Sequence, residues 1–331
     1  MQTSRPAPRR YAPTGRHLML VHRPRYFGPR PDGLDERTQE FVLTGDLPDS
    51  HALFNDGQVR FHDLQAAMAM VRQASSGIGR THFGVASDRV AVFYRFGLDA
   101  GDPGAWERTS GPGRLTVDMR VRPDKVISGV PRALEFETRL DIDGVPAGTA
   151  SASLLFLAPN THRSHREHMR HAMLKATMGH LDQPAAHPAA VAAGPAPHEV
   201  GRMSPGNVLL RSPVSVDGQR LSVGVLAPGT WPIAPARRDG APSPLVLEAL
   251  RQTALLTVHR LHGLDPQTCA PVALHAHFRG HTEPDLPLRC VAVAQPVRRD
   301  ALGRPLIEVT LTLTQAGRAV TEATVSVVEA L

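Results

Sequence analysis

The sequence predicts an α+β fold made of two similar units, each with one long helix and several antiparallel strands. Three observations support this prediction: two amphipathic stretches share a pattern, strand-like runs flank both of them, and turn signals separate the strands. The length agrees, because 331 residues can form two domains that each bury a core. We therefore expect a tandem repeat in which a sheet wraps the helix of each unit.

The clearest helical stretch runs from Ser243 to Gly263. Ser243 is suited to cap the start of the helix, and Gly263 is suited to end it. Apolar residues recur at spacings of three and four, at positions 247, 250, 254, 258 and 261. A carboxylate, a guanidinium and an amide share the adjoining surface, on Glu248, Arg251 and Gln252.

A second helical stretch, Asp63 to about Gly79, repeats the Arg-Gln pair as Arg72 and Gln73, 179 positions upstream. The same offset, without gaps, aligns Val21, Arg23, Gly45, Leu47 and Gly84 with Val200, Arg202, Gly224, Leu226 and Gly263. A register held over this length indicates a duplicated unit. The copies differ at one charged position, because Ala69 stands where the second helix has Glu248.

Strand-like runs surround both helices. In the first unit we expect strands at 17–22, 40–45, 89–96, 114–121, 133–142 and 147–157. In the second unit we expect them at 200–210, 219–225, 271–278, 286–295, 305–314 and 319–328. Asp143-Gly144 is a strong hairpin signal, and Ala316-Gly317 occupies the equivalent position in the second unit.

The segment 161–199 matches nothing in the repeat. It begins with His162, His165, His168 and His171 at every third position among arginines, and it becomes rich in Ala and Pro from 183 to 198. Because the arginines oppose a cation, we favour a solvated basic helix followed by a linker over a metal site. The predicted organisation is a disordered basic tail at 1–16, a unit at 17–160, this connecting segment, and a unit at 200–331.

Composition restricts the class of protein. Hydrophobic residues make up 41% and charged residues 21%, which is typical of a globular protein, and no apolar run is long enough to span a bilayer. The N-terminal segment lacks the apolar core of a secretory signal, so we expect a cytoplasmic protein. Cys269 and Cys290 form no disulfide framework or zinc motif, and we interpret them as buried small residues.

The formal net charge of +6 comes mainly from arginine. Such a surface could meet nucleic acid, a phosphorylated substrate or an acidic carrier protein. No nucleic-acid-binding motif or set of stacking aromatic residues accompanies the charge, so nucleic acid is the weaker interpretation.

Glu248 and Arg251 are candidates for chemistry. A partly buried glutamate can act as a general base, because burial raises its pKa while a neighbouring arginine lowers it. The arginine could instead bind a phosphate or carboxylate through two hydrogen bonds. The alternative is a Glu–Arg pair that only holds two helices or two repeats together.

With Val-His-Arg and Val-Gly-Arg opening the two halves, and Glu248-Ala-Leu-Arg-Gln-Thr-Ala in the second helix, the sequence resembles the A-factor biosynthesis hotdog family of actinobacteria. The resemblance spans about residues 17–160 and 198–331. It implies a double hotdog, in which each half is one helix wrapped by an antiparallel sheet and the halves pack as an internal pseudo-dimer.

The resemblance also implies an activity in the synthesis of γ-butyrolactone and butenolide signals. A β-ketoacyl group would pass from an acyl carrier protein to the hydroxyl of dihydroxyacetone phosphate, without a metal or redox cofactor. In this scheme Glu248 activates the hydroxyl, Arg251 binds phosphate or orients the thioester, and N–H groups near 245–247 stabilise an oxyanion. The expected substrate-binding residues are Gln252, Arg72, Gln73 and His51.

Two features keep other functions open. Ala69 departs from the family pattern of a glutamate in the first helix as well, so the first half could be a scaffold or an acyl-binding half. The whole protein could then be a divergent enzyme or a non-catalytic acyl- or lactone-binding protein. A hotdog thioesterase or dehydratase that acts on carrier-bound chains is the alternative enzyme. The sequence leaves the acyl chain and any homodimer undetermined.

Overall fold

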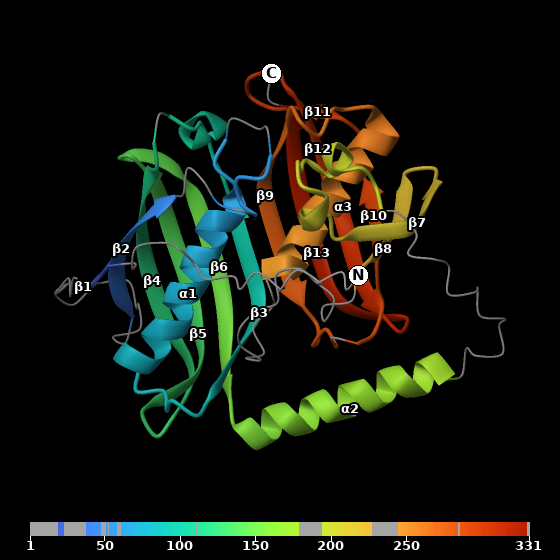
Figure 1. Cartoon of the computed structure of the whole chain (residues 1–331). Helices are drawn as coiled ribbons and strands as arrows, with labels where there is room; N and C mark the ends of the chain where they lie inside the picture. The colour runs from blue at the N-terminus through green and yellow to red at the C-terminus, as the bar shows by residue number, and fades with distance from the viewer. Residues whose placement is uncertain are drawn as a thin grey trace, which may run out of the picture.

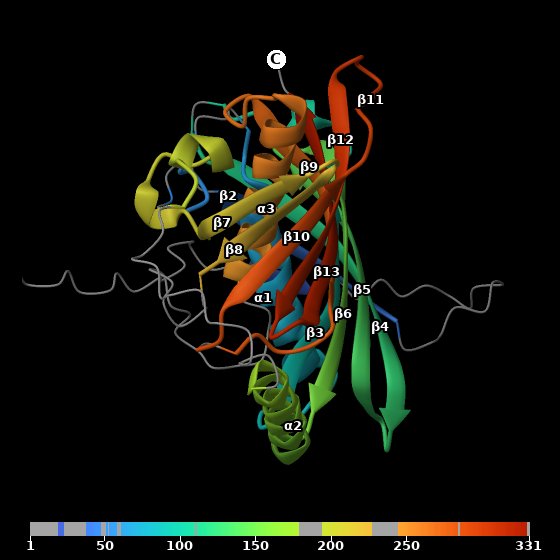
Figure 2. The ribbon, with the colours of Figure 1, turned by 90° about the vertical axis from the view of Figure 1, so that its right-hand side faces the viewer.

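In the computed structural model, one large antiparallel sheet carries two long helices on the same face (Figures 1 and 2). The structure describes residues 19–22, 38–47, 51, 53–57, 61–109, 111–178, 194–226, 244–283 and 285–329. The predicted disordered tail at 1–16 and most of the Ala/Pro-rich linker lie outside these residues.

The first half contains one helix, α1 (Leu64–His82), and a short 3₁₀ turn, η1 (Pro103–Trp106). Its strands are β1 (Met19–His22), β2 (Gln39–Leu47), β3 (Val90–Asp99), β4 (Gly113–Ile127), β5 (Val130–Ile142) and β6 (Val145–Leu157). They lie in the order β1-β2-β4-β5-β6-β3. The chain then enters α2 (Pro159–Met178).

The second half contains the helix α3 (Pro244–His262), preceded by the 3₁₀ turns η2 (Pro197–Val200) and η3 (Pro205–Asn207). Its strands are β7 (Leu210–Asp217), β8 (Arg220–Val225), β9 (Cys269–Phe278), β10 (Leu288–Ala294), β11 (Arg298–Arg299), β12 (Pro305–Gln315) and β13 (Arg318–Glu329). They continue the sheet as β9-β13-β12-β10-β8-β7, with β11 paired to β12.

The two halves share one strand order. The path β2-β4-β5-β6-β3 in the first half corresponds to β8-β10-β12-β13-β9 in the second, and the equivalent strands β3 and β9 pair antiparallel at the centre of the sheet. Gly97 of β3 lies opposite His275 of β9 in that pairing. The sheet is therefore continuous across the junction between the halves.

The expected helices are confirmed. The Asp63 carboxylate accepts a hydrogen bond from the Gln65 N–H at the start of α1, and the helix continues three residues past the predicted end at Gly79. Gly263 follows α3 with a φ of +71°, a conformation that glycine adopts without strain. Ser243, the expected cap of α3, lies outside the described residues.

One predicted strand is wrong. The run 200–210 forms η2 and η3 with a loop between them, and a strand begins only at Leu210. Gly201 adopts a φ of +64°, which is not an extended conformation, and Pro205 lacks the N–H that a strand would donate to its neighbour. This run therefore does not form a hydrogen-bonded strand. The other expected strands are present, most of them longer than predicted. The turns are as expected, with positive φ at Asp143, Gly144, Ala316 and Gly317.

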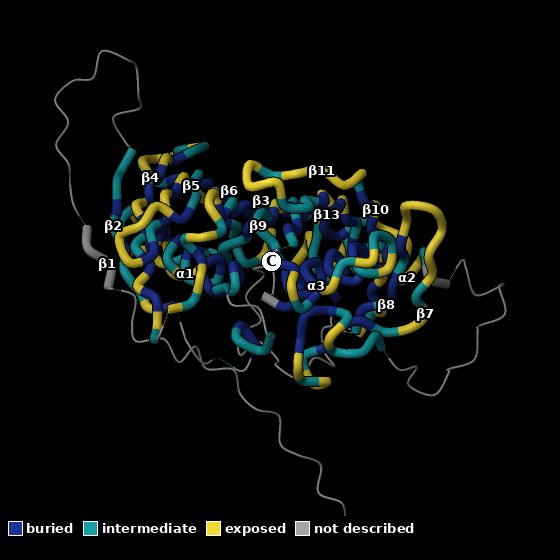
Figure 3. The backbone as a smooth tube through the Cα atoms, turned by 90° about the horizontal axis from the view of Figure 1, so that it is seen from above, coloured by how far each residue is buried: buried dark blue, intermediate teal, exposed yellow. Residues whose placement is uncertain are grey.

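The core lies between the sheet and the helices. In β4 buried and exposed residues alternate along the strand, as in a sheet that has one face to solvent. Every residue of α3 from Leu245 to Val258 is buried, so this helix is covered on all sides (Figure 3). Polar residues on such a helix need internal partners, which directs attention to Glu248, Arg251 and Gln252.

The predicted basic helix is present as α2, which runs beneath the second half (Figure 1). Arg166 and Arg170 bond the buried carboxylate of Glu283 at 3.0–3.2 Å, and Arg170 also bonds Asp285. These contacts fix α2 to the loop between β9 and β10. The predicted solvated helix is thus partly anchored. Among the described residues, no helix is long and apolar enough to cross a membrane.

Candidate functional site

Glu248 lies at the centre of a buried network between the halves. Its carboxylate is 0% exposed and accepts hydrogen bonds from Arg202 Nε at 2.7 Å and Arg202 Nη2 at 2.6 Å. Gln65 Nε2, from α1 of the first half, donates to Oε2 at 2.8 Å, and Gln252 Nε2 donates to Oε1 at 2.6 Å. Both carboxylate oxygens are therefore engaged, and the network joins residues from the two halves.

Arg202 connects this network to the first half. It is 1% exposed, and besides its two bonds to Glu248 it donates to the backbone oxygen of Leu53 at 2.6 Å and to Asp63 Oδ2 at 3.2 Å. A planar guanidinium that reaches several acceptors at once is typical of a buried arginine. The loop that follows η2 thereby holds the N-terminus of α1 against α3.

The charges in the network stabilise one another. Burial raises the pKa of the Glu248 carboxyl, but Arg202 and Arg251 together lower it by more than burial raises it. The net effect is a pKa below the ordinary value. Burial lowers the pKa of Arg202, whereas Glu248 and Asp63 raise it, with a net increase. Two carboxylates and two guanidiniums thus form a neutral buried set.

Arg251 is the weakly bonded member of the set. Its donors lie 3.4 Å from the Val200 oxygen and 3.5 Å from the Gly201 oxygen. Its nitrogens lie 3.6 Å from Glu248 and 3.9 Å from Asp63. Good N–H···O bonds measure about 2.9–3.0 Å, so within the described part of the chain these contacts leave donor capacity of Arg251 unused. Burial and the neighbouring Arg202 hold the pKa of Arg251 below its ordinary value.

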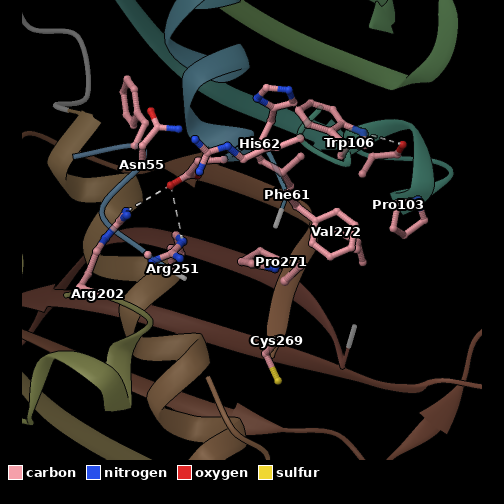
Figure 4. Close-up of a pocket in the computed structure, with 17 residues that line it drawn as sticks. Asn55, Phe61, His62, Pro103, Trp106, Arg202, Arg251, Cys269, Pro271 and Val272 are labelled. Carbon is pink, nitrogen blue, oxygen red and sulfur yellow. Dashed lines mark hydrogen bonds and ion pairs between the residues drawn. The ribbon is translucent and has the colours of Figure 1, made fainter. Parts of the chain in front are cut away.

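A cavity opens beside this arginine (Figure 4). Its charged lining residues are Asp63, Arg108, Arg202 and Arg251. Trp106, Pro271 and Val272 belong to its apolar side. The space between the lining atoms is about 550 Å³ when the part open to solvent is included, and water-sized groups can occupy about 40 Å³ of it. This space accommodates a small polar group and not a long acyl chain.

The N-terminus of α1 faces the same cavity, because Asp63 and Leu64 both line it. Leu64 is the first helical residue, and its N–H has no acceptor within the helix. Helix N-termini carry partial positive charge that stabilises an anion or a polarised carbonyl. This site thus combines a carboxylate, a guanidinium and the positive end of a helix around one small space.

The site departs from the expectation for Glu248. None of its surface is exposed, and it is not part of the cavity wall. The carboxylate therefore has no lone pair available to take a proton from a substrate in this arrangement. Asp63 is the carboxylate that faces the cavity.

Gln252 and His51 serve the surrounding structure. Gln252 donates to Glu248 and to the Asn207 oxygen and accepts from the Leu209 N–H, so its amide is fully used. His51 Nδ1 accepts the N–H groups of Leu53 and Phe54 at 3.1 Å, and this orders the loop whose Leu53 oxygen receives Arg202. Burial and Arg202 hold the pKa of His51 below its ordinary value despite the opposing effect of Asp63.

Arg72 and Gln73 do not join the cluster. Gln73 is exposed on α1, and neither residue lines the cavity. The N–H groups at 245–247, expected to stabilise an oxyanion, belong to buried residues of α3 that do not line it either.

Sequence reasoning missed the roles of Arg202, Asp63 and Gln65. In the sequence, Arg202 stands out as the repeat partner of Arg23 in the Val-Gly-Arg motif, and Asp63 stands out as a helix cap. One signal for the network is present in the second half. Glu248 and Arg251 lie within an apolar helix, Arg202 precedes that helix, and charged residues that become buried need one another as partners.

The cysteines are buried, as expected. Cys269 lines the cavity, but burial raises the pKa of its thiol to about 12, and burial likewise raises that of Cys290 to about 12. Neither thiol is activated as a nucleophile. In the described part of the chain, no group of His, Cys, Asp and Glu side chains is arranged to hold a metal ion.

Comparison with known proteins identifies the fold. Residues 183–328 match the family model AfsA, the A-factor biosynthesis hotdog domain. No curated protein matches the chain. The match covers the second half, and the resemblance of the first half to the same family stays a prediction.

Two solved structures are similar over most of the chain. The 12:0-ACP thioesterase from Umbellularia californica aligns with a TM-score of 0.51 and 12% identity, over 87% of this chain and 93% of that one. A putative oleoyl thioesterase from Lactobacillus plantarum aligns with a TM-score of 0.51 and 11% identity, over 89% and 98%. At these identities the likeness concerns the fold alone.

Proposed function

We propose, from the membership of residues 183–328 in the A-factor biosynthesis hotdog family, that this protein is an acyltransferase. It moves a β-ketoacyl group from an acyl carrier protein to the hydroxyl of dihydroxyacetone phosphate. The two halves, with their common strand order, form a tandem hotdog that acts as an internal pseudo-dimer in the cytoplasm. The product feeds the synthesis of a butenolide or γ-butyrolactone signal.

The observation that carries this proposal is Arg251. Arg251 is a buried guanidinium in the wall of a cavity, and its contacts with the described residues are all 3.4 Å or longer, so it has donors to offer to an anionic substrate. A phosphate or a polarised thioester oxygen would supply shorter, charge-assisted hydrogen bonds than the backbone carbonyls do. The cavity is also small for a long acyl chain, because water-sized groups can occupy only about 40 Å³ of it.

The chemistry follows from the groups around the cavity. The thioester carbonyl would lie at the N-terminus of α1, where the Leu64 N–H stabilises the oxyanion as the acceptor hydroxyl adds. Asp63 takes the hydroxyl proton and returns it to the departing thiolate when the C–S bond breaks. One ester bond forms, one thioester bond breaks, and the carboxylate is regenerated.

Glu248 acts in this scheme as a positioning residue. It fixes Arg202 through two short bonds, and Arg202 in turn holds Asp63, so the carboxylate and Arg251 keep their places at the cavity. Gln65, Gln252 and His51 support the same arrangement. Ala69 replaces the equivalent acid in the first half, so we propose one active site per chain, with Arg72 and Gln73 as remnants of the second.

A thioesterase is the second candidate, because Asp63 could equally activate water beside the same carbonyl. The two are separated by mass spectrometry after the protein is mixed with a β-ketoacyl carrier thioester, with and without dihydroxyacetone phosphate. An acylated phosphate ester that forms only with the acceptor supports the transferase. Free acid at equal rates in both mixtures identifies a thioesterase, and an unchanged thioester over hours refutes both for that acyl chain.

A further inference from the structure

A second pocket lies at the opposite end of α1. It is formed by the segment after that helix, including Val85, Ala86 and Arg89, and by the hairpin between β4 and β5, including Val130 and Arg132. Phe156 of β6 also lines it. The 19 residues of α1 separate this pocket from the cavity at Asp63 by about 28 Å, at about 1.5 Å per residue. It is therefore a separate site.

The pocket is larger inside than the cavity near Arg251. Its volume is about 220 Å³, and its apolar lining includes the buried side chains of Val85 and Phe156. Ile127, which is 54% exposed, extends the apolar surface at the tip of the hairpin. A cavity of about 150 Å³ can hold a benzene molecule, so this volume has room for an alkyl chain of about eight carbons.

Two arginines give the pocket its charge. Arg89 and Arg132 are half-buried, and neither guanidinium has a hydrogen bond or ion pair with any residue that the structure describes. The backbone of Arg89 donates its N–H to the Ala86 oxygen at 3.0 Å, and its oxygen is approached by Arg80 Nη2 at 3.5 Å. Elsewhere in the molecule, half-buried arginines such as Arg166 and Arg304 have carboxylate partners. Two unpaired guanidiniums beside an apolar pocket favour an anionic ligand.

We propose that this pocket binds a single-chain anionic amphiphile, with its carboxylate or phosphate at Arg89 and Arg132 and its alkyl chain against Val85 and Phe156. The site is independent of the acyl transfer proposed above, because it shares no residue with the cavity near Arg251. Burial of the chain supplies affinity, and the two arginines select for a negative head group.

The test is calorimetric titration with octanoate and with octyl phosphate, both below their micellar concentrations, and with 1-octanol as the uncharged probe. The titrations use the Arg251→Gln protein, so that the other cavity does not contribute anion binding. We expect one site per chain for at least one of the two anions, with octanol binding at least about tenfold more weakly.

Three variants locate that site. Arg89→Gln and Arg132→Gln should each weaken anion binding about tenfold, and Ala86→Trp should abolish it by filling the pocket from its exposed rim. Arg318→Gln is the matched control, because Arg318 is exposed in the second half and far along the chain from the pocket. Absence of binding by both anions, or binding that all three variants leave unchanged, overturns the proposal. Neither result bears on acyl transfer.

Discussion

Replacement of Glu248 by alanine should destabilise the fold more than most single substitutions. The change removes both short bonds to Arg202 and leaves two buried guanidiniums with Asp63 as their remaining carboxylate. Removal of one partner from a buried ion pair costs about 3–5 kcal/mol, because the other charge stays buried without compensation. We expect a loss of this size in the free energy of unfolding.

Urea unfolding followed by circular dichroism measures this loss. Glu137→Ala is the matched control, because Glu137 is exposed on β5, and its effect should stay within about 0.5 kcal/mol. A double variant, Glu248→Leu with Arg202→Met, should recover much of the loss, since apolar residues of similar size often replace a buried pair without cost. An unfolding free energy for Glu248→Ala that matches the control would refute this account of the network.

The same variant changes the pH dependence of stability. Because the pKa of Glu248 is lowered in the folded protein, its contribution is present above the ordinary glutamate pKa of 4.5 and is lost as the pH falls through the folded value. The difference in stability between the wild type and Glu248→Ala should therefore shrink in acid. A difference that stays constant from pH 7 to pH 3 contradicts the assignment of a charged Glu248.

Three other predictions follow from single contacts. Asp63→Asn keeps an N-cap acceptor for the Gln65 N–H but loses the proton acceptor and the charge that faces Arg202, so some stability should be lost. Transfer activity should fall at least about a hundredfold in protein that circular dichroism shows to be folded, and retained activity would exclude Asp63 as the base. Glu283→Gln removes the charge that anchors α2, so trypsin should cleave that helix faster than in the control Glu322→Gln, whose parent residue pairs with Arg279 at the surface. Burial, together with the neighbouring His162, Arg166 and His165, lowers the pKa of His281 to about 4. The free energy of unfolding should therefore fall as the pH drops from 6.5 towards 4. A series of unfolding measurements across this range should show that His281→Phe loses the part of this pH dependence that His281 contributes.

Local features of the fold were predictable from the sequence. Asp63 caps α1 and Gly263 ends α3 because these residue types satisfy the backbone at helix ends without help from distant segments. The hairpin turns at Asp143-Gly144 and Ala316-Gly317 also depend only on local conformation. The repeat register anticipated that the halves would share a strand order.

The site was less predictable because its residues meet through tertiary packing. Glu248 and Arg251 share one helix, so their proximity follows from helical spacing. Arg202 lies 46 positions earlier, in an irregular segment whose apolar pattern predicts a strand, and Gln65 comes from the other half. No local sequence pattern places Arg202 and Gln65 beside Glu248. For the same reason, the sequence does not show that these residues cover the Glu248 carboxylate, whereas Asp63 faces the cavity.

The most direct test of the proposed function compares product formation by the wild type and Arg251→Met, with a β-ketoacyl carrier thioester and dihydroxyacetone phosphate, by mass spectrometry. With the residues that the structure describes, Arg251 makes no hydrogen bond shorter than 3.4 Å, so its replacement should leave a folded protein, which circular dichroism would verify. We expect the acylated phosphate ester from the wild type and at least about a hundredfold less from the variant. Equal rates of ester formation by the two proteins would contradict the assignment of the site to the cavity beside Arg251.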